Sequence, residues 1–544
     1  MQTHREVSTV FSRAPAGLDA PMVRVEVHLG TGLPAFNLVG LPEAVVRESK
    51  ERVRAALVTA GYDFPQRRIT VNLSPADLPK EGGRFDLPIA VGILAADQRI
   101  PQQALKDKEF YGELSLGGAL RETRQLLPAL IAGARSHSEI ILPAANALEA
   151  SLVRGAKLRL ADHLSQVVAA LKGNESALPS AVNRGLAARA DRVASADRAM
   201  SADRAAPADR ATSADRAAPS DRAAPTNPGS PTPDLADVQG QFAGKRALEI
   251  AAAGEHGLLM IGPPGAGKTL LAQRLPGLLP PLSEPEALEV ASLESAAGRR
   301  PSIGGRRPFR SPQHTASVAA LIGGGAMRPG ELSLAHLGVL FLDEFPEFPR
   351  NALEALREPM ESGTVVLARL KRTCEFPAKF QLVAAMNPCP CGYAGDIRGR
   401  CHCTAEQVAR YRSRISGPLI DRIDIHVEIM ALPVEHLIRD VPEAAESSAV
   451  VAQRVAAARA RQMARQGRLN GRLTPAEIAR YCALAREPRA LLVTAIARLG
   501  LSARAYHRVL KVARTCADLR GEADIRTMDV AEAVKLRALD RPID

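Results

Sequence analysis

Short apolar runs separated by longer mixed segments are the main pattern in the middle of the chain. Three of these runs are Leu258–Ile261, Val339–Leu342 and Gln381–Met386. Runs of this length between helical or loop segments are typical of buried strands in a parallel sheet, because helices cover both faces of such a sheet. The pattern therefore predicts an α/β domain.

The patterns on either side of this central region are different. Upstream, Val23–Leu29 and Ile69–Leu73 alternate or run apolar like strands, and Glu43–Ala60 has the spacing of a helix. These segments predict an α+β domain. Downstream, residues 446–541 are rich in Ala, Arg and Leu with helical periodicity, which predicts a helical bundle.

A low-complexity segment separates the first domain from the second. An Asp-Arg pair recurs every six residues from Asp191 to Arg222, among Ala, Ser and Pro. Such a segment cannot build a core and its charges cancel, so a solvated, disordered linker is favoured over a functional array. For 544 residues, the predicted division is a first domain at 1–171, the linker at 172–235, a central domain at 236–435 and a helical domain at 436–544.

Basic residues outnumber acidic residues. The chain has 71 Lys and Arg against 59 Asp and Glu, a net charge of +12 with a pI near 9.6. Residues 451–544 alone hold 19 basic and 9 acidic residues, a net +10. This excess favours a polyanionic partner. Aromatic residues make up only 3% and Trp is absent, which argues against base-stacking platforms.

The apolar stretches and the cysteines indicate the compartment. The longest stretches, such as Leu87–Ala96, are well below the roughly 20 residues of a membrane span, and the first residues lack an apolar signal segment. Four of the seven Cys lie between Cys389 and Cys403, which suits metal ligation or reduced thiols better than disulfides. We therefore expect a cytoplasmic protein without a membrane partner.

A phosphate-binding loop is the strongest chemical signal in the chain. Gly262–Thr269 matches G-x-x-x-x-G-K-T between a predicted strand and a predicted helix. Glycines let backbone N–H groups surround phosphates, and the helix N-terminus favours negative charge. Lys268 would reach the β- and γ-phosphates of ATP, and Thr269 would coordinate Mg²⁺. The predicted nucleotide-binding residues are Gly262, Pro263, Pro264, Gly265, Ala266, Gly267, Lys268 and Thr269.

Two carboxylates and an amide follow the other predicted strands. Asp343 would hold Mg²⁺ through water, and Glu344 would polarise the attacking water. An apolar run before Asp-Glu is a weak motif alone, but the phosphate loop upstream makes it specific. Asn387 can orient water near the γ-phosphate; the alternative is an ordinary turn residue before Pro388.

Two arginines complete the candidate catalytic set. Arg422, in the segment Ser416–Asp424, and Arg504, two residues after Ser502, could neutralise transition-state charge. Because Arg is abundant in this chain, a surface or salt-bridge role is the alternative for each.

Four cysteines form C-x-C-x₉-C-x-C after Asn387. They are Cys389, Cys391, Cys401 and Cys403. Four thiolates are enough for tetrahedral Zn²⁺, although the close C-x-C spacing weakens this interpretation. Reduced thiols in a loop are the alternative, and both interpretations stay open.

Together these motifs resemble the YifB/ComM family of magnesium-chelatase-like AAA+ ATPases. The first domain resembles the family's Lon-protease-like (ribosomal S5 domain 2-like) domain. The implied fold is an α/β AAA+ P-loop domain with a parallel sheet, preceded by the α+β Lon-protease-like domain and followed by a C-terminal helical lid bundle. The resemblance rests on Thr31–Glu43, Ile69–Pro88, Asp237–Gly267, Arg307–Glu344, Gln381–Pro388 and Tyr411–His426.

The resemblance implies a homo-hexameric ring with ATP between subunits. Arg422 would be the arginine finger acting in trans, Arg504 the second sensor in cis or trans, and Asn387 the first sensor. ComM proteins are known as DNA branch-migration helicases in natural transformation. The implied activity is therefore a Mg²⁺-dependent ATP hydrolase that moves single-stranded or branched DNA during recombination or transformation.

A basic hairpin is a second implication of the resemblance. In the related minichromosome-maintenance helicases a hairpin before the first-sensor strand projects into the pore. Here Thr364–Ala368 and Thr373–Phe376 would flank a tip that contains Lys371 and Arg372. A solvated turn is the alternative.

The chain departs from the family pattern at two places. In Pro79–Phe85, Arg84 stands where a Lon-type nucleophile is expected, and Gly112–Ala129 lacks the partner Lys. Without a Ser–Lys dyad we expect no proteolytic substrate. Gln313 stands where many relatives carry His, and it receives no predicted role.

Two rival functions use the same ATPase core. One is a motor subunit for metal chelation, which the absence of a D-x-S-x-S metal-adhesion motif disfavours. The other is a protein-remodelling ring whose first domain binds polypeptide, and this rival stays open.

Overall fold

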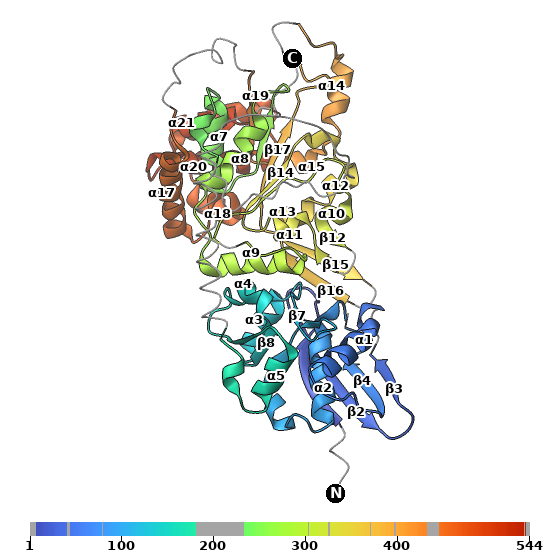
Figure 1. Cartoon of the computed structure of the whole chain (residues 1–544). Helices are drawn as coiled ribbons and strands as arrows, with labels where there is room; N and C mark the ends of the chain where they lie inside the picture. The colour runs from blue at the N-terminus through green and yellow to red at the C-terminus, as the bar shows by residue number, and fades with distance from the viewer. Residues whose placement is uncertain are drawn as a thin grey trace, which may run out of the picture.

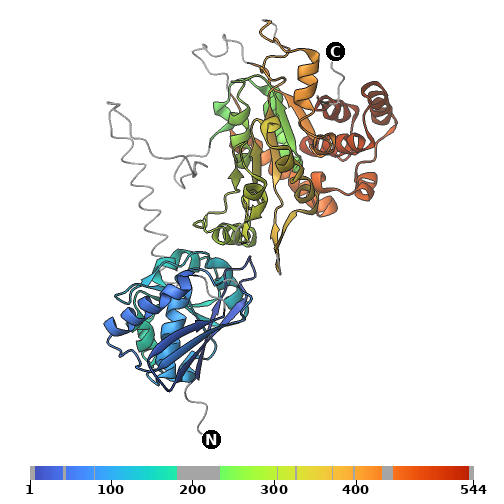
Figure 2. The same ribbon diagram turned by 90° about the vertical axis from the view of Figure 1, so that its right-hand side faces the viewer.

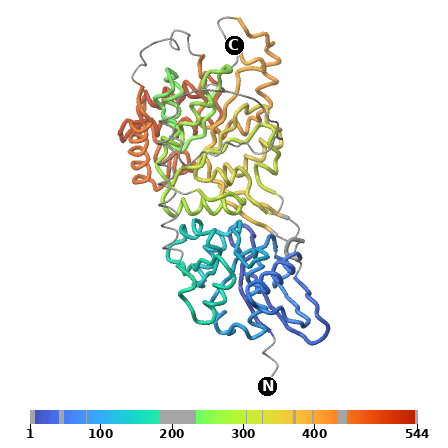
Figure 3. Tube along the Cα trace, in the orientation of Figure 1, coloured from blue at the N-terminus to red at the C-terminus, as the bar shows by residue number. Residues whose placement is uncertain are grey.

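Two units stacked end to end make up the computed structural model (Figure 1). The N-terminal unit contains a mixed sheet, and the second unit contains a parallel sheet with the C-terminal helices beside it. The Cα trace shows the same end-to-end arrangement of the two units (Figure 3). The Asp-Arg repeat and the residues Leu370 and Lys371 lie outside the described residues. The structure describes residues 7–40, 44–78, 80–180, 233–302, 304–324, 327–369, 372–395, 399–431, 445–537 and 539.

The N-terminal sheet has seven strands in the order β3-β4-β2-β1-β5-β8-β9. The predicted strands are confirmed as β2 (Met22–Gly30) and β4 (Arg68–Ser74), and the predicted helix is α1 (Ala44–Thr59). Strand β2 is antiparallel to both of its neighbours, whereas the other pairs are parallel. The other strands are β1 (Val7–Arg13), β3 (Ala35–Val39), β5 (Lys108–Phe110), β8 (Glu139–Pro143) and β9 (Lys157–Ala161), with a separate small pair β6 (Glu113–Leu114) and β7 (Leu120–Arg121).

Helix α2 (Asp86–Ala96) forms the centre of this unit. All of its residues are buried, so the longest apolar stretch of the sequence is an internal helix. Gly92 permits its close contact with the sheet, because a Cβ there would lie 2.6 Å from Cγ2 of Val27. No helix among the described residues is both long and apolar enough to cross a bilayer. The remaining helices of the unit are α3 (Leu127–Arg135), α4 (Ala147–Ala150) and α5 (Leu164–Leu171).

The second unit is built on five parallel strands in the order β11-β14-β17-β10-β18. The three predicted strands are confirmed with their predicted bounds: β10 (Leu258–Ile261), β14 (Val339–Leu342) and β17 (Gln381–Met386). The edge strands are β11 (Phe309–Arg310) and β18 (Ile425–Glu428). Because all five run in one direction, their carboxyl ends lie along one edge of the sheet.

Successive residues of the strands enter two different cores. Leu258 and Met260 pack with α7 (Phe242–Gly254) and α8 (Lys268–Leu278), whereas Leu259 and Ile261 face the other side. Figure 2 shows helices on both faces of this sheet. The other helices of this part are α9 (Glu284–Ala296), α10 (Val318–Ile322), α11 (Glu331–Leu334), α12 (Arg350–Glu354), α13 (Arg357–Ser362), α14 (Ala405–Arg412) and α15 (Gly417–Ile420).

The predicted C-terminal bundle is confirmed. Its buried residues, among them Val455 and Val509, belong to the same core as α7, α8 and one face of the parallel sheet. The bundle is therefore packed continuously on the sheet unit. Its helices are α17 (Ser448–Gln466), α18 (Pro475–Tyr481), α19 (Arg486–Leu499), α20 (Ala503–Arg520) and α21 (Thr527–Lys535).

A buried polar network adds to this packing. Nδ1 of His256 lies 2.8 Å from the Asp424 carboxylate and Nε2 lies 2.7 Å from Oγ1 of Thr515 on α20. Arg508 donates to the other oxygen of Asp424 at 2.8 Å. Burial alone would raise the pKa of Asp424, but the charge of Arg508 and the bond to His256 lower it. The carboxylate therefore stays charged and ties the bundle to the start of β18.

The predicted hairpin is confirmed as the strand pair β15 (Thr364–Arg369) and β16 (Arg372–Pro377). It extends toward the N-terminal unit (Figure 2). There, a Cβ on Gly17 would lie 3.4 Å from Sγ of Cys374 in β16. Two further strands form a short pair, β12 (Gly323–Gly324) and β13 (Arg328–Pro329).

Helix α9 carries the main contact between the two units. The backbone N–H of Leu127 donates to Oγ of Ser295 at 3.2 Å, and the Gln125 amide donates to the carbonyl of Ala296 at 3.0 Å. Ala291 is buried within an apolar cluster of the N-terminal unit. The units are thus joined by packing and by hydrogen bonds.

A buried histidine in β18 should make stability depend on pH. His426 is fully buried, and neither ring nitrogen has a hydrogen-bond partner among the described residues. Burial, with the charge of Arg537, lowers its pKa to about 3. Because the unfolded chain takes up this proton near pH 6.5, stability is present above that pH and is lost as the pH falls toward 3, by about 2 kcal/mol at pH 5.

Replacing His426 by Leu should reduce this loss. Urea unfolding at pH 7.5 and pH 5.0, followed by circular dichroism, gives the change in unfolding midpoint. The exposed His28, changed to Gln, serves as the control. An unchanged midpoint difference in His426→Leu would contradict the assignment.

Candidate active site

The phosphate-binding loop connects β10 to α8 as predicted. Gly262 must be glycine, because a Cβ there would lie 2.2 Å from the carbonyl oxygen of Ile429. Gly265 and Gly267 have φ values of 75° and 89°, where other residues are strained. Helix α8 starts at Lys268, so its free N–H groups point toward the loop. This arrangement suits a polyphosphate.

Lys268 spans the loop and reaches the neighbouring strand. Its Nζ donates to the carbonyls of Gly262 at 2.7 Å and Pro263 at 3.0 Å, and to Oδ1 of Asn387 at 3.1 Å. Burial lowers the pKa of Lys268, and the nearby carboxylates of Asp343 and Glu344 oppose that shift. The ammonium group therefore lies between the loop and the end of β17.

Thr269 and Asp343 meet at the carboxyl end of the sheet. Oγ1 of Thr269 donates to Oδ2 of Asp343 at 2.7 Å, and Oδ1 of Asp343 accepts from the backbone N–H of Glu344 at 3.0 Å. A hydroxyl and a carboxylate are hard oxygen donors of the kind Mg²⁺ prefers. The donor set therefore fits Mg²⁺ beside a phosphate chain.

His314 contacts Glu344, a contact that the sequence did not reveal. Its Nδ1 lies 3.0 Å from Oε2 of Glu344, which adopts the left-handed conformation with φ 52°. Both side chains are about half exposed. The sequence signal available was only a histidine beside Gln313, in a segment without regular structure.

The phosphate-binding loop, the two carboxylates and Asn387 surround an open cleft of about 400 Å³. That volume lies within the usual range for small-molecule sites. The lining residues are Pro264, Gly265, Gly267, Lys268, Thr269, Leu270, Asp343, Glu344, Met386 and Asn387. The structure thus brings together most of the residues predicted to bind ATP or to activate water.

The two arginines lie away from this cleft. Arg422 precedes β18, whose first residue pairs with Leu258, whereas the phosphate loop follows the other end of β10. A four-residue strand spans about 13 Å, so Arg422 lies at the opposite edge of the sheet. It bonds to Glu361 and to the carbonyl of Pro418, and Arg504 lies 3.9 Å from the neighbouring Asp421. Both arginines are therefore at one edge, and the phosphate loop is at the other.

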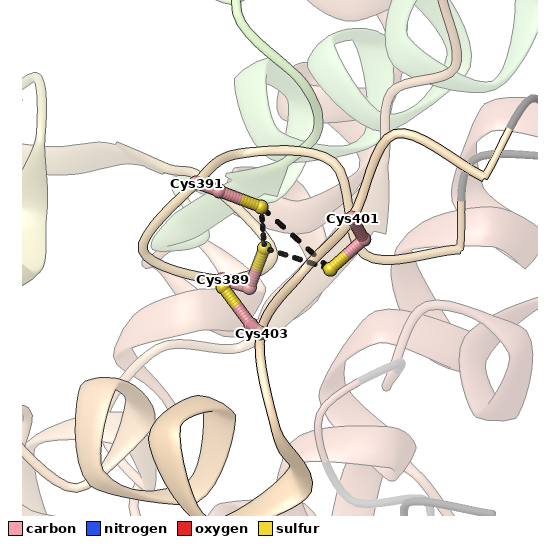
Figure 4. Close-up of side chains that lie close together, drawn as sticks. All are labelled: Cys389, Cys391, Cys401 and Cys403. Carbon is pink, nitrogen blue, oxygen red and sulfur yellow. Dashed lines mark hydrogen bonds between the residues drawn. The ribbon is translucent and has the colours of Figure 1, made fainter.

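The four predicted cysteines come together in the loop between β17 and α14 (Figure 4). Sulfur–sulfur distances are 3.3 Å between Cys389 and Cys391, 3.7 Å between Cys389 and Cys401, and 3.6 Å between Cys391 and Cys401. Cys403 completes the group, in which all sulfurs lie within 4.8 Å of one another. Four sulfurs each 2.3 Å from one tetrahedral ion would be about 3.8 Å apart. The donor set fits Zn²⁺.

Arg84 is buried and has a packing role in the N-terminal unit. Its guanidinium donates to the carbonyls of Arg124 at 2.6 Å and Gln125 at 3.1 Å. Burial lowers its pKa to about 10. Because Gln125 contacts α9, Arg84 holds a loop of the N-terminal unit that packs against the second unit.

Three family models match the chain. They are described as subunit ChlI of Mg-chelatase (residues 25–146), magnesium chelatase, subunit ChlI (234–437) and magnesium chelatase, subunit ChlI C-terminal (445–537). The chain is 45% identical to Competence protein ComM of Haemophilus influenzae over 538 residues, and 45% identical to the uncharacterized protein YifB of Escherichia coli over 542 residues. Each alignment covers 98% of both chains. A shorter similarity, 28% identity over 122 residues, covers 22% of this chain and 13% of human DNA helicase MCM8.

The contact between His314 and Glu344 should affect turnover more than nucleotide binding. In His314→Ala, Glu344 loses a partner that holds its carboxylate, so we expect kcat for ATP to fall about tenfold with little change in KM. Gln313→Ala, an exposed neighbour, is the matched control. Steady-state phosphate release provides both constants. If His314→Ala had the same kcat and KM as the parent, His314 would have no role in the site.

Proposed function

Because the chain belongs to the YifB/ComM family of magnesium-chelatase-like AAA+ ATPases, we propose that it is a ring-forming, Mg²⁺-dependent motor that couples ATP hydrolysis to DNA branch migration. The proposal rests on full-length similarity to a competence protein and on the cleft at Lys268 and Asp343. Recombination or natural transformation would be its setting.

One observation supports the proposed ring of subunits. Arg422 and Arg504 lie at the edge of the sheet opposite the phosphate loop of their own chain. If either neutralises charge on ATP, it must act on another copy, so Arg504 is proposed to act in trans together with Arg422. The ion pairs to Glu361 and Asp421 hold these arginines until a neighbour's nucleotide replaces them. A closed hexamer gives each cleft one such neighbour.

The residues of the cleft divide the chemistry among them. Lys268 and the loop N–H groups bind the phosphates, and Lys268 exchanges its carbonyl contacts for phosphate oxygens. Mg²⁺ held near Thr269 and Asp343 would neutralise charge between the β- and γ-phosphates. Glu344 orients the attacking water and accepts its proton, while Asn387 aligns the water with Lys268.

Three features support DNA as the polymer that is moved. The C-terminal bundle carries most of the excess positive charge, and phosphate contacts give sequence-independent affinity. The hairpin β15–β16 carries Lys371 and Arg372 at its tip in the sequence. Two similar proteins are named a competence protein and a DNA helicase.

We also propose that the four-cysteine cluster binds one Zn²⁺. The three sulfur–sulfur contacts of 3.3–3.7 Å are close to tetrahedral spacing, and the backbone N–H of Ala394 donates to Sγ of Cys389 at 3.2 Å, as N–H groups do around metal thiolates.

Hydrolysis and strand exchange on different DNAs test the motor. The purified protein is incubated with ATP and linear duplex, single-stranded or four-way-junction DNA, with Glu344→Gln as the variant that binds ATP without hydrolysing it. We expect stimulation by DNA and movement of the junction by the parent only. Equal rates of hydrolysis with every DNA, together with no strand exchange, would contradict the proposed DNA motor and favour a chelatase-like or protein-remodelling ATPase.

Removing the two cations of the hairpin tip should weaken DNA binding. In Lys371→Ala/Arg372→Ala we expect lower affinity for all DNA sequences and a shallower slope of log affinity against log salt concentration. Hydrolysis without DNA should persist, because the hairpin does not line the cleft. Fluorescence anisotropy over a range of salt concentrations measures the slope. If the double variant bound and moved DNA as the parent does, the hairpin tip would be interpreted as a solvated turn.

Mixing two inactive variants should restore activity if Arg422 acts in trans. Lys268→Ala subunits cannot bind ATP, and Arg422→Ala subunits cannot complete a neighbour's site. A mixed ring contains intact sites that combine the phosphate loop of Arg422→Ala with the Arg422 of Lys268→Ala. ATP hydrolysis across mixing ratios should therefore exceed that of either variant alone. No recovery at any ratio, with rings intact by light scattering, would count against action between subunits.

A further inference from the structure

The cysteine loop, defined here by its described residues 388–395 and 399–403, is bounded by two elements of the ATP site. It begins directly after Asn387, whose Oδ1 accepts from Lys268. It ends before Thr404, which caps α14 through the backbone N–H of Gln407. Cys389 and Cys403 are thus the first and last cysteines of a segment that runs from the end of β17 to the start of α14.

The loop also packs on the phosphate-binding loop. Gly392 has φ 87°, and a Cβ there would lie 2.7 Å from Cδ of Pro264 and 3.9 Å from Cγ of Asn387. The backbone at Gly392 therefore lies directly against both elements. Its own N–H donates to the carbonyl of Cys389 at 3.0 Å, which ties this contact to the first cysteine.

Helix α14 returns to the start of the loop. Tyr411 is buried, and burial raises the pKa of its phenol to about 12. A hydrogen bond with the backbone of Asn387 opposes this shift. Two contacts therefore hold the ends of the cysteine loop together. One is between Tyr411 of α14 and Asn387, and the other is the cluster of four sulfurs.

We propose that Zn²⁺ in the cysteine loop positions Asn387 and Pro264, so that ATP hydrolysis depends on an ion that never contacts the nucleotide. The inference rests on the ATPase and zinc site proposed above. A metal that joins Cys389 and Cys391 to Cys401 and Cys403 closes the loop across nine intervening residues. The closure presses the Gly392 backbone on Pro264 and fixes the end of β17. Without the ion, nothing joins the first cysteine pair to the second, and the loop loses this closure.

Zinc content tests the first step. The full-length parent should contain one equivalent of zinc, which Cys401→Ser/Cys403→Ser should lose and the control Cys374→Ser should keep. Replacement by Co²⁺ should give the visible absorption bands of a tetrahedral tetrathiolate ion. Lack of zinc in the parent together with failure to take up Co²⁺ would overturn the metal site and leave the ATPase proposal untouched.

A double-mutant cycle tests the coupling. Zinc is removed from the parent with a mercurial reagent and a chelator and then restored, so that the result does not depend on the folding of a cysteine variant. Removal should lower kcat for ATP roughly tenfold or more, and restoration should recover it. Removal from Asn387→Ala should lower kcat by a smaller factor than in the parent, because part of the effect of the ion passes through that residue. Equal losses in both backgrounds, or parent kinetics after zinc removal, would overturn the coupling while the zinc site stands.

Gly392→Ala provides an independent check. It adds a Cβ against Pro264 and should lower kcat while zinc content stays at one equivalent. Gly395→Ala is the matched control, because Gly395 has a similar φ of 80° in the same loop but no atom within 4 Å of its added Cβ. Equal kinetics in the two variants, whether lowered or at the parent rate, would show that the contact with Pro264 does not set the rate, and would overturn the inference.

Discussion

The common direction of the five central strands is the constraint on which the candidate site depends. Parallel pairing in register brings the ends of β10, β14 and β17 to one edge, where Lys268, Asp343 and Asn387 come within hydrogen-bond reach of one another or of Thr269. The same register assigns the start of β18 to the far edge. Separation of the phosphate loop from Arg422 is therefore a property of the sheet, and no side-chain rearrangement within one chain removes it.

Much of this edge could be predicted because each of its signals is local. The glycines, Lys268 and Thr269 lie in one run, and each acidic or amide residue directly follows an apolar strand. The contact between Thr269 and Asp343 follows once the strands are known to be parallel, although 74 positions separate the two residues.

Contacts made by irregular segments could not be predicted in this way. His314 lies in a segment whose path depends on β11 and on the loop after it, so nothing in the spacing relates it to Glu344. For Arg84 the sequence indicated what was absent, a nucleophile, but not what the side chain does. Its carbonyl partners at positions 124 and 125 are about 40 residues away, and the cost of burying its charge is met by those hydrogen bonds. The spacing of the cysteines in the sequence did not decide between a metal site and reduced thiols, whereas the distances between their sulfurs define a set of metal donors.

The shared core of the C-terminal bundle has a mechanical consequence. Residues of α17 and α20 pack without interruption against α7, α8 and the sheet, and the network at His256 and Asp424 joins α20 to β18. Swinging the bundle away would expose an apolar surface and break the contacts of Arg508 with Asp424 and of Thr515 with His256, both of which are unfavourable. The sheet and the bundle therefore behave as one stiff block. In the ring proposed above, the large movements of a working cycle would therefore take place where blocks from different chains meet.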